Sequence, residues 1–387
     1  SECVCLMASA EFRYVMTRVY QPGNNPNPII AELPFTDVNF TQQLNSVGTF
    51  QGHVLLSGIN TTDLNVYDGT IPGKTILWVL YTDPVTLESK PVWSGVIWAR
   101  EYDSSSQTLS IGAQEMMSLY NRRRISTTKD YGNTFYDPMY IAYELMKYAE
   151  ALPKGKTGLT YNTNTSIYAT KKIYEGYELK SVYQAIKDLA ANFFDFKIAP
   201  RVVNGNLVNR FELGDPLGTV YSSSSVTAPV FQLPGNIVEY KFPEDASGAA
   251  NKLYGLGYGA NDKKKIAVAT DPSKIGVNGD WPLLEDTTNY IDIGDFQLIK
   301  DLTLGQLNAI SYPPTTIEVV VPPYIDPYFP TYQIGDQVRM DIEDDYFPSG
   351  LNGEILRIVA ISVAPGENGP SRITLTLSRL LAAGQVS

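Results

Sequence analysis

Residues 91–124, PVWSGVIWAREYDSSSQTLSIGAQEMMSLYNRRR, are the stretch that decides the fold. Residues 92–98 are mostly β-branched or aromatic, and such side chains fit a pleated, half-buried surface. Residues 103–106 carry short polar side chains that bond their own backbone, so they predict a reversal of the chain. Apolar residues then alternate from Leu109 to Ala113, which predicts a second strand with one buried face.

From residue 114 the apolar spacing becomes that of a helix. Met116, Met117 and Tyr120 fall on one helical side, and three arginines at 122–124 close the segment, where cations suit a helix C-terminus. A wide hairpin therefore leads into a short helix. We expect this helix to cap the open end of a β-barrel.

The residues before this hairpin predict further strands. Residues 1–20, 29–40 and 47–57 each hold strand-forming residues, and TILWVLY at 75–81 is an apolar run short enough for a buried strand. Together with the hairpin they are enough strands to close a small barrel. Residues 60–73 read as a loop.

The middle of the chain changes to helical patterns. Asp137-Pro138 is a helix start, because Asp can cap free amides and Pro is accepted in the first turn. A second helix is expected over about 179–193, and residues 154–170 read as a surface excursion. Asn204-Gly205, flanked by apolar runs, is the strongest short hairpin signal in the sequence.

Strand patterns return from residue 237, with one helix expected at 295–310. Residues 372–377 alternate strictly between apolar and polar side chains, which predicts a strand with one buried face. The remaining expected strands lie at residues 237–242, 251–258, 265–269, 316–321, 337–342 and 354–363. This pattern predicts a second barrel.

The predicted fold class is mainly β with an α+β insertion. Three domains are expected: a first β-barrel over residues 1–125, a helical and α+β insertion over 126–235, and a second β-barrel over 236–387. A chain of 387 residues is long enough for two or three domains. No fixed-period repeat points to a solenoid or propeller.

Composition excludes several functional classes. A hydrophobic content of 43% indicates a globular protein, and a net charge of −11 argues against a dedicated nucleic-acid binder. Cys3 and Cys5 have no second pair, so a zinc site is not expected. No apolar run approaches the ~18 residues of a membrane span, and no signal peptide is visible, so a soluble intracellular origin is the simplest expectation.

These patterns resemble phage tail hub proteins, which form the β-barrel ring at the tip of a tail. The resemblance rests on a strand V-W-S-G-x-I, a Y-D turn, a strand ending I-G-A-Q-E and a helix ending R-R-R. Local matches in the second half are YGLGY at 254–258, WPL at 281–283 and YQIGDQVR at 332–339. QPGNNPNP at 21–28 and the excursion at 154–170 depart from the family, and we expect phage-specific contacts there.

The resemblance implies a structural virion protein and not an enzyme. It implies a homotrimeric ring in which each copy supplies two similar barrels, so that three copies match a sixfold tail tube and line the DNA exit channel. The partners implied are a distal tail protein or tail-tube ring above and tip, fibre or spike proteins below, with DNA only in passage and no membrane insertion by this chain. The location implied is the virion tail tip, after assembly in the host cytoplasm.

No catalytic, cofactor-binding or metal-binding residue is expected, and no cofactor. His53 is the only histidine, lies in an apolar strand, and no G-x-S-x-G elbow accompanies it. The glycines of residues 255–259, GLGYG, do not have nucleotide-loop spacing, so they indicate a slim strand that another backbone approaches. Glu101 and Glu115 could be assigned as the two carboxylates of a glycosidase, but so could any two acidic residues in a chain of this length.

Charged clusters read as surface features. The acidic cluster lacks the spacing of a calcium loop and is expected to be solvated, with cation binding left open. Its members are Asp341, Glu343, Asp344 and Asp345. Lysines 263–265 indicate a charged turn, and arginines 122–124 are expected to pair with an acidic neighbouring subunit. A tail-associated cell-wall hydrolase and a glycan-binding module with exposed Tyr and Trp remain the alternatives.

Overall fold

The computed structural model describes residues 11–21, 28–83, 86–162, 164–221, 228–277, 279–311, 316–366 and 371–379. The predictions for Cys3, Cys5 and most of QPGNNPNP therefore lie outside the described residues. Within the described ranges, none of the helices combines the length and the apolar character that crossing a bilayer requires.

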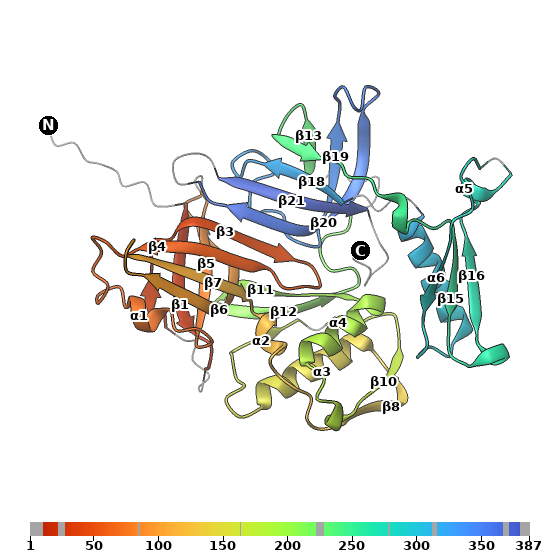
Figure 1. Cartoon of the computed structure of the whole chain (residues 1–387), viewed down its shortest axis with the longest axis horizontal. Coiled ribbons are helices and arrows are strands. Elements are labelled where there is room, and N and C mark those ends of the chain that lie inside the picture. The colour runs from red at the N-terminus through yellow and green to blue at the C-terminus, as the bar shows by residue number, and fades with distance from the viewer. Residues whose placement is uncertain are drawn as a thin grey trace.

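Most strands belong to one 13-stranded sheet, drawn mainly in red to orange and in blue in Figure 1, with β13 in green. Its main path, in spatial order, is β14 (Glu239–Lys241), β18 (Thr316–Val321), β21 (Arg372–Arg379), β20 (Leu351–Ala364), β3 (Thr36–Gln43), β4 (Thr49–Leu55), β7 (Thr108–Glu115), β6 (Ser89–Asp103), β5 (Thr75–Thr82), β1 (Phe12–Arg18) and β2 (Ala31–Glu32). Off this path, β19 (Gln337–Ile342) pairs with β20, and β13 (Val230–Leu233) pairs with β19. All pairs are antiparallel except β13 with β19.

The predicted strand-rich halves are present, but they are joined. β3 from the first half pairs with β20 from the second, with Phe40 opposite Val363 and Gln43 opposite Ala360. Among the described residues the pairing runs from β14 to β2 without closing on itself. The mainly β class with a mixed insertion is confirmed, whereas the strand pairing does not show the two closed barrels. The reason is that two strand edges far apart in sequence satisfy each other's backbone groups.

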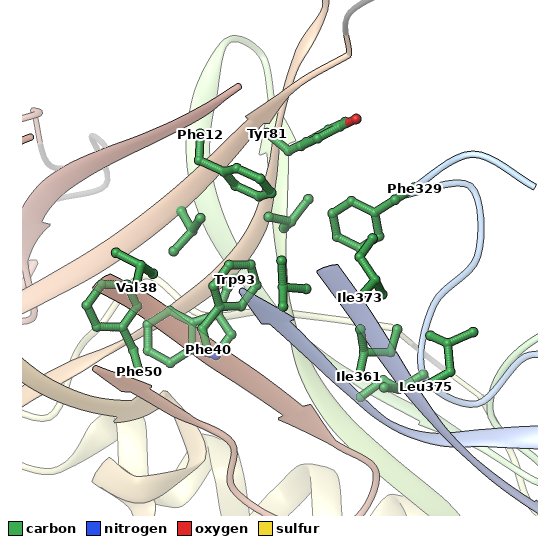
Figure 2. Close-up of a cluster of buried hydrophobic side chains, with 14 of the residues drawn as sticks. Phe12, Val38, Phe40, Phe50, Tyr81, Trp93, Phe329, Ile361, Ile373 and Leu375 are labelled. Atoms are coloured by element: carbon green, nitrogen blue, oxygen red, sulfur yellow. The ribbon is translucent and has the colours of Figure 1, made fainter. Parts of the chain in front are cut away.

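A single hydrophobic core lies under both halves. Figure 2 shows Phe12, Phe40 and Trp93 from the first half facing Phe329 and Ile373 from the second. The Tyr81 and Phe329 rings meet edge to face with centroids 5.2 Å apart. Aromatic pairs in this geometry add to the stabilisation from burial, so the two halves stabilise each other.

The insertion packs two long helices against two small sheets. Its elements are α2 (Met117–Tyr120), β8 (Lys129–Tyr136), α3 (Pro138–Ala151), β9 (Thr160–Tyr161), β10 (Thr170–Tyr174), α4 (Val182–Phe193), β11 (Asp195–Val203) and β12 (Asn206–Gly214). Asp137 caps α3 as predicted, because its side chain accepts from the Met139 amide at 2.8 Å. The Asn204-Gly205 turn is also confirmed, with φ values of 52° and 75°.

Two predictions for the insertion need correction. The second helix begins at Val182 and not near 179, because the Ser181 hydroxyl caps it by accepting from the Gln184 amide at 3.1 Å. Residues 154–170 are not purely a surface excursion. Thr157 and Leu159 are buried. β9 pairs with β12 and is the third strand of the sheet that β11 and β12 form. The Glu150 carboxylate anchors this segment by accepting from the Thr157 amide at 2.8 Å.

A third unit stands apart from the large sheet on the right of Figure 1. It comprises β15 (Lys252–Leu256), β16 (Ile266–Thr270), β17 (Glu285–Asn289) and α6 (Phe296–Ile310). The sequence predicted β15, β16 and α6 as parts of the second β region and did not predict β17. These strands form their own sheet, because Leu253 and Ala267 pack under α6. A Cβ on Gly255 would lie 1.9 Å from the Thr303 hydroxyl of α6. The slim strand is thus confirmed, but a helix side chain and not another backbone approaches it at Gly255.

Short helical segments complete the described chain. They are α1 (Val66–Gly69), α5 (Pro272–Ile275) and the 3-10 turns η1 (Gly176–Glu178), η2 (Ala246–Gly248) and η3 (Asn261–Lys263). Residues 60–73, expected as a loop, therefore contain one helical turn. η3 ends at Lys263, the first lysine of the turn at 263–265.

Candidate functional site: a buried polar junction

The most conspicuous group of buried charges lies where the two strand sets and the insertion meet. Arg357 of β20 and Asp195 of β11 form an ion pair with Nη2 and Oδ2 2.5 Å apart. Their side chains are 5% and 0% exposed. The guanidinium also donates to the Gly335 carbonyl at 3.0 Å and the Leu217 carbonyl at 2.5 Å. Its charge is thus neutralised and hydrogen-bonded, as a buried cation requires.

Asp195 links further segments through its two carboxylate oxygens. Oδ1 accepts from the Asn45 side-chain amide at 2.7 Å, and Oδ2 accepts from the Leu217 backbone amide at 3.1 Å. Asn45 lies in the turn between β3 and β4, and also accepts from the Phe196 amide at 2.7 Å. One carboxylate therefore fixes the insertion against both halves of the large sheet.

A second charged group lies two residues along β11. The Lys197 ammonium is 3.8 Å from the Glu212 carboxylate, and donates to Gln333 Oε1 at 3.1 Å and the Ile334 carbonyl at 3.2 Å. Arg201 donates two hydrogen bonds to Glu212, at 3.0 and 2.6 Å. Burial, which disfavours the charged form, lowers the pKa of Lys197 to about 8.

Glu115 at the end of β7 is the third buried charge of the junction. One carboxylate oxygen accepts from the Gly48 amide at 2.6 Å. Burial raises the pKa of Glu115 to about 8, although that hydrogen bond and the nearby Lys197 both lower it. Gly48 has no room for a side chain, because a Cβ there would lie 1.9 Å from the Thr41 carbonyl.

The raised pKa of Glu115 predicts a pH-dependent stability. Between its unfolded pKa near 4.5 and its folded pKa of about 8, the folded state binds more protons than the unfolded state. The contribution of Glu115 to the free energy of unfolding is therefore fully present below pH 4.5 and is lost above pH 8. Between these values it decreases by up to ~1.4 kcal/mol per pH unit. Glu115→Gln should flatten this decline in urea unfolding series measured from pH 5 to 8. An unchanged slope would contradict it.

A groove of about 280 Å³ opens beside this junction. Glu115 and Lys197 line it together with Pro200 and Arg201 of β11. Its other walls come from Lys90 to Val92 on β6 and from the segment between Phe329 and Ile334. The first half of the chain, the insertion and the second half therefore meet around one concave surface.

The structure does not bring the residues singled out in the sequence together. His53 lies on β4, where its Nδ1 is 2.9 Å from the hydroxyl of Ser110 on the neighbouring strand. Among the described residues no carboxylate bonds this imidazole, so a Ser–His–Asp arrangement is not formed there. Glu101 is paired across the ladder with Ser110 and is exposed, whereas Glu115 is buried at the junction.

The acidic cluster is used for local hydrogen bonds. Asp341 pairs with Arg339 at 3.0 Å, and Asp344 accepts from the Tyr240 hydroxyl at 2.5 Å and from the Phe347 amide at 2.9 Å. Within the described ranges no three His, Cys, Asp or Glu side chains converge in a way that suits a metal ion.

The arginine prediction is corrected for one of its three residues. The Arg123 guanidinium is 3.0 Å from the Glu150 carboxylate and donates to the Ala149 carbonyl at 3.1 Å. Its charge is therefore satisfied within the chain and is not available to a neighbouring subunit. Arg122 and Arg124 are exposed, and their pairing with an acidic subunit stays a prediction.

Asp195 and Arg357, the centre of the junction, were not predicted from the sequence. A signal was present, because Asp195 stands between Phe194 and Phe196, and Arg357 between Leu356 and Ile358. A single charge inside an apolar strand is expected to be buried with a partner. The pattern does not identify the partner.

Over 94–96% of its length the chain has the fold of phage tail proteins. It superposes on the prophage tail protein gp18 of Listeria monocytogenes EGD-e with a TM-score of 0.57 at 12% identity, covering 94% of both chains. A tail protein of Neisseria meningitidis MC58 gives a TM-score of 0.58 at 12% identity, covering 96% of this chain and 98% of that one.

A third tail protein has the same fold. The 43 kDa tail protein of prophage MuSo2 from Shewanella oneidensis gives a TM-score of 0.58 at 13% identity, covering 95% of this chain and 98% of that one. No family model and no curated protein sequence matches. The resemblance read from the sequence is thus confirmed for the fold.

Proposed function

We propose that the chain is a structural subunit of a phage tail and forms the hub at its distal tip. The observation that carries the proposal is the agreement in fold over nearly the full length of three tail proteins, with 94–98% of each chain covered. Agreement from end to end, rather than over one module, favours a shared structural role for the whole chain.

Three copies form a ring in this proposal. Each copy supplies two barrel-like strand sets, one built on β1 to β7 and one on β14 and β18 to β21, so that three copies offer six similar units to a sixfold tail tube. The direct β3–β20 pairing and the buried Arg357–Asp195 pair support it, because they hold the two strand sets of one copy in a constant relative position.

The ring joins a distal tail protein or tail-tube ring above it to tip, fibre or spike proteins below it. Its net charge of −11 suits an acidic bore that repels the phosphate backbone of DNA in passage. The role needs no chemistry at a catalytic residue. The protein belongs to the virion in this proposal, and is assembled in the host cytoplasm.

The mass and symmetry of the purified protein test the proposal. We expect sedimentation analysis to give a trimer, alone or with tail-tube protein, and electron-microscopy class averages to show a threefold ring with six lobes. A strict monomer at all soluble concentrations, with no assembly on tail-tube protein, would overturn it. Release of soluble fragments from cell-wall polymer would favour the hydrolase alternative.

A further inference from the structure

β11 is an edge strand, and its free edge faces the groove beside the junction. It pairs with β12 on one side only, in the three-stranded order β11-β12-β9. At its start, Phe196 bonds Asn45 and not β12. The Asn45 backbone amide donates to the Phe196 carbonyl at 3.2 Å, and the Phe196 amide donates to Asn45 Oδ1 at 2.7 Å. Backbone N–H and C=O groups alternate between the two edges of an antiparallel strand. The backbone groups of Ile198, Pro200 and Val202 therefore point away from β12, as those of Phe196 do.

These outward groups lack partners. Among the described residues no hydrogen bond reaches the amide or carbonyl of Ile198 or Val202, or the carbonyl of Pro200. Ile198 is only 7% exposed, and buried backbone groups without partners are rare in folded proteins. All three residues line the groove of about 280 Å³. The groove thus offers a row of donors and acceptors that remains unused.

The groove also has walls that suit a peptide. Phe329, Pro330 and Tyr332 provide an apolar side. Tyr332 is 1% exposed, and its hydroxyl has no hydrogen-bond partner within the part of the chain that is described. A buried hydroxyl of this kind is a second group that a bound molecule would satisfy.

Charge at the groove is cationic although the protein is acidic. Of its four charged lining residues, Lys90, Lys197 and Arg201 are cations. The fourth is Glu115, whose raised pKa of about 8 leaves it mostly protonated at neutral pH. Glu88 pairs with Lys90, and Glu212 pairs with both Lys197 and Arg201, so these two carboxylates offset two of the three positive charges and leave a net charge of +1. A segment with acidic side chains is therefore favoured over a basic one.

We propose that this groove binds an extended acidic peptide strand of a partner protein, which adds to the free edge of β11. Ile198 and Val202 each offer one donor and one acceptor to the strand, and Pro200 offers an acceptor only. The proposal does not depend on the trimeric ring.

Fluorescence anisotropy with labelled nonapeptides tests this proposal. The first probe alternates valine and aspartate. The second replaces aspartate by lysine, and the third carries N-methyl groups on the amides of one edge. We expect the aspartate peptide to bind, the lysine peptide to bind more weakly and the N-methylated peptide to bind only through its unmethylated edge or not at all.

Val202 supplies a matched pair of variants, because it is half exposed and its amide is not used within the sheet. Val202→Pro removes one donor and should weaken binding of the aspartate peptide about five- to tenfold. Val202→Thr keeps the amide and should bind within about twofold of the unmodified protein. Amide hydrogen exchange at 198–202 in the unmodified protein should slow when peptide is added.

Three results would overturn the proposal. They are equal binding by the two Val202 variants, no binding by any probe, and no change in exchange at 198–202. A change in self-association instead of peptide binding would assign the edge to a second copy. The oligomeric mass is measured separately, so failure here leaves the hub proposal standing.

Discussion

Arg357→Met is expected to lower the free energy of unfolding by about 3–5 kcal/mol. The variant leaves the Asp195 carboxylate, which is 0% exposed, without its cation. It also removes the hydrogen bonds to the Gly335 and Leu217 carbonyls. A buried charge without a partner is far more costly than the net contribution of the intact pair.

The control for this variant is an exposed arginine in the same sheet. Arg372 on β21 pairs with Glu239, and both side chains are 58% exposed. Arg372→Met should therefore change the unfolding free energy by less than about 1 kcal/mol. Urea unfolding followed by tryptophan fluorescence compares the two. Equal effects of the two substitutions would show that the junction does not hold the segments together.

Trp93→Ala is expected to lower the free energy of unfolding by about 3–5 kcal/mol. The Trp93 side chain is fully buried, and its ring centroid is 5.6 Å from that of Phe50 and 6.4 Å from that of Phe40 (Figure 2). Its indole N–H donates to the Thr41 carbonyl at 2.9 Å. The substitution leaves both a cavity and an acceptor without its donor.

Trp281 is the matched control for this second substitution. It is 36% exposed and lies against the Lys274 ammonium, which is 4.1 Å from the ring centroid. Trp281→Ala should cost about 2 kcal/mol, because Lys274 is buried and a cation–π contact withdrawn from water is worth about that much. The prediction for Trp93 fails if its cost does not exceed that of Trp281 in calorimetric unfolding.

Local signals in the sequence were reliable where short-range physics decides. Asp137 capped its helix because an Asp before Pro at a helix start can accept from the free amides. Asn204-Gly205 made a hairpin because both residues tolerate positive φ. β18 and β19 begin and end where their alternating patterns do, at Thr316–Val321 and Gln337–Ile342.

The sequence was less informative about strands with few apolar residues and about which strands share a sheet. β8 was not predicted, because KDYGNTFY contains one glycine and few apolar residues, and it is stabilised by pairing with β10. β15 and β16 were assigned to the wrong sheet, since an alternating pattern predicts a buried face without showing what covers it. Here α6 covers that face.

The sequence alone determined the class of the protein: a mainly β chain with a mixed insertion and the order of elements found in phage tail proteins. These properties follow from side-chain periodicity, caps and turns, which act over a few residues. Only the tertiary structure decided that β3 pairs with β20, that Asp195 meets Arg357 162 positions later, and that the edge of β11 is left open. Such contacts depend on which distant surfaces fit and exclude water together, and no local pattern carries that information.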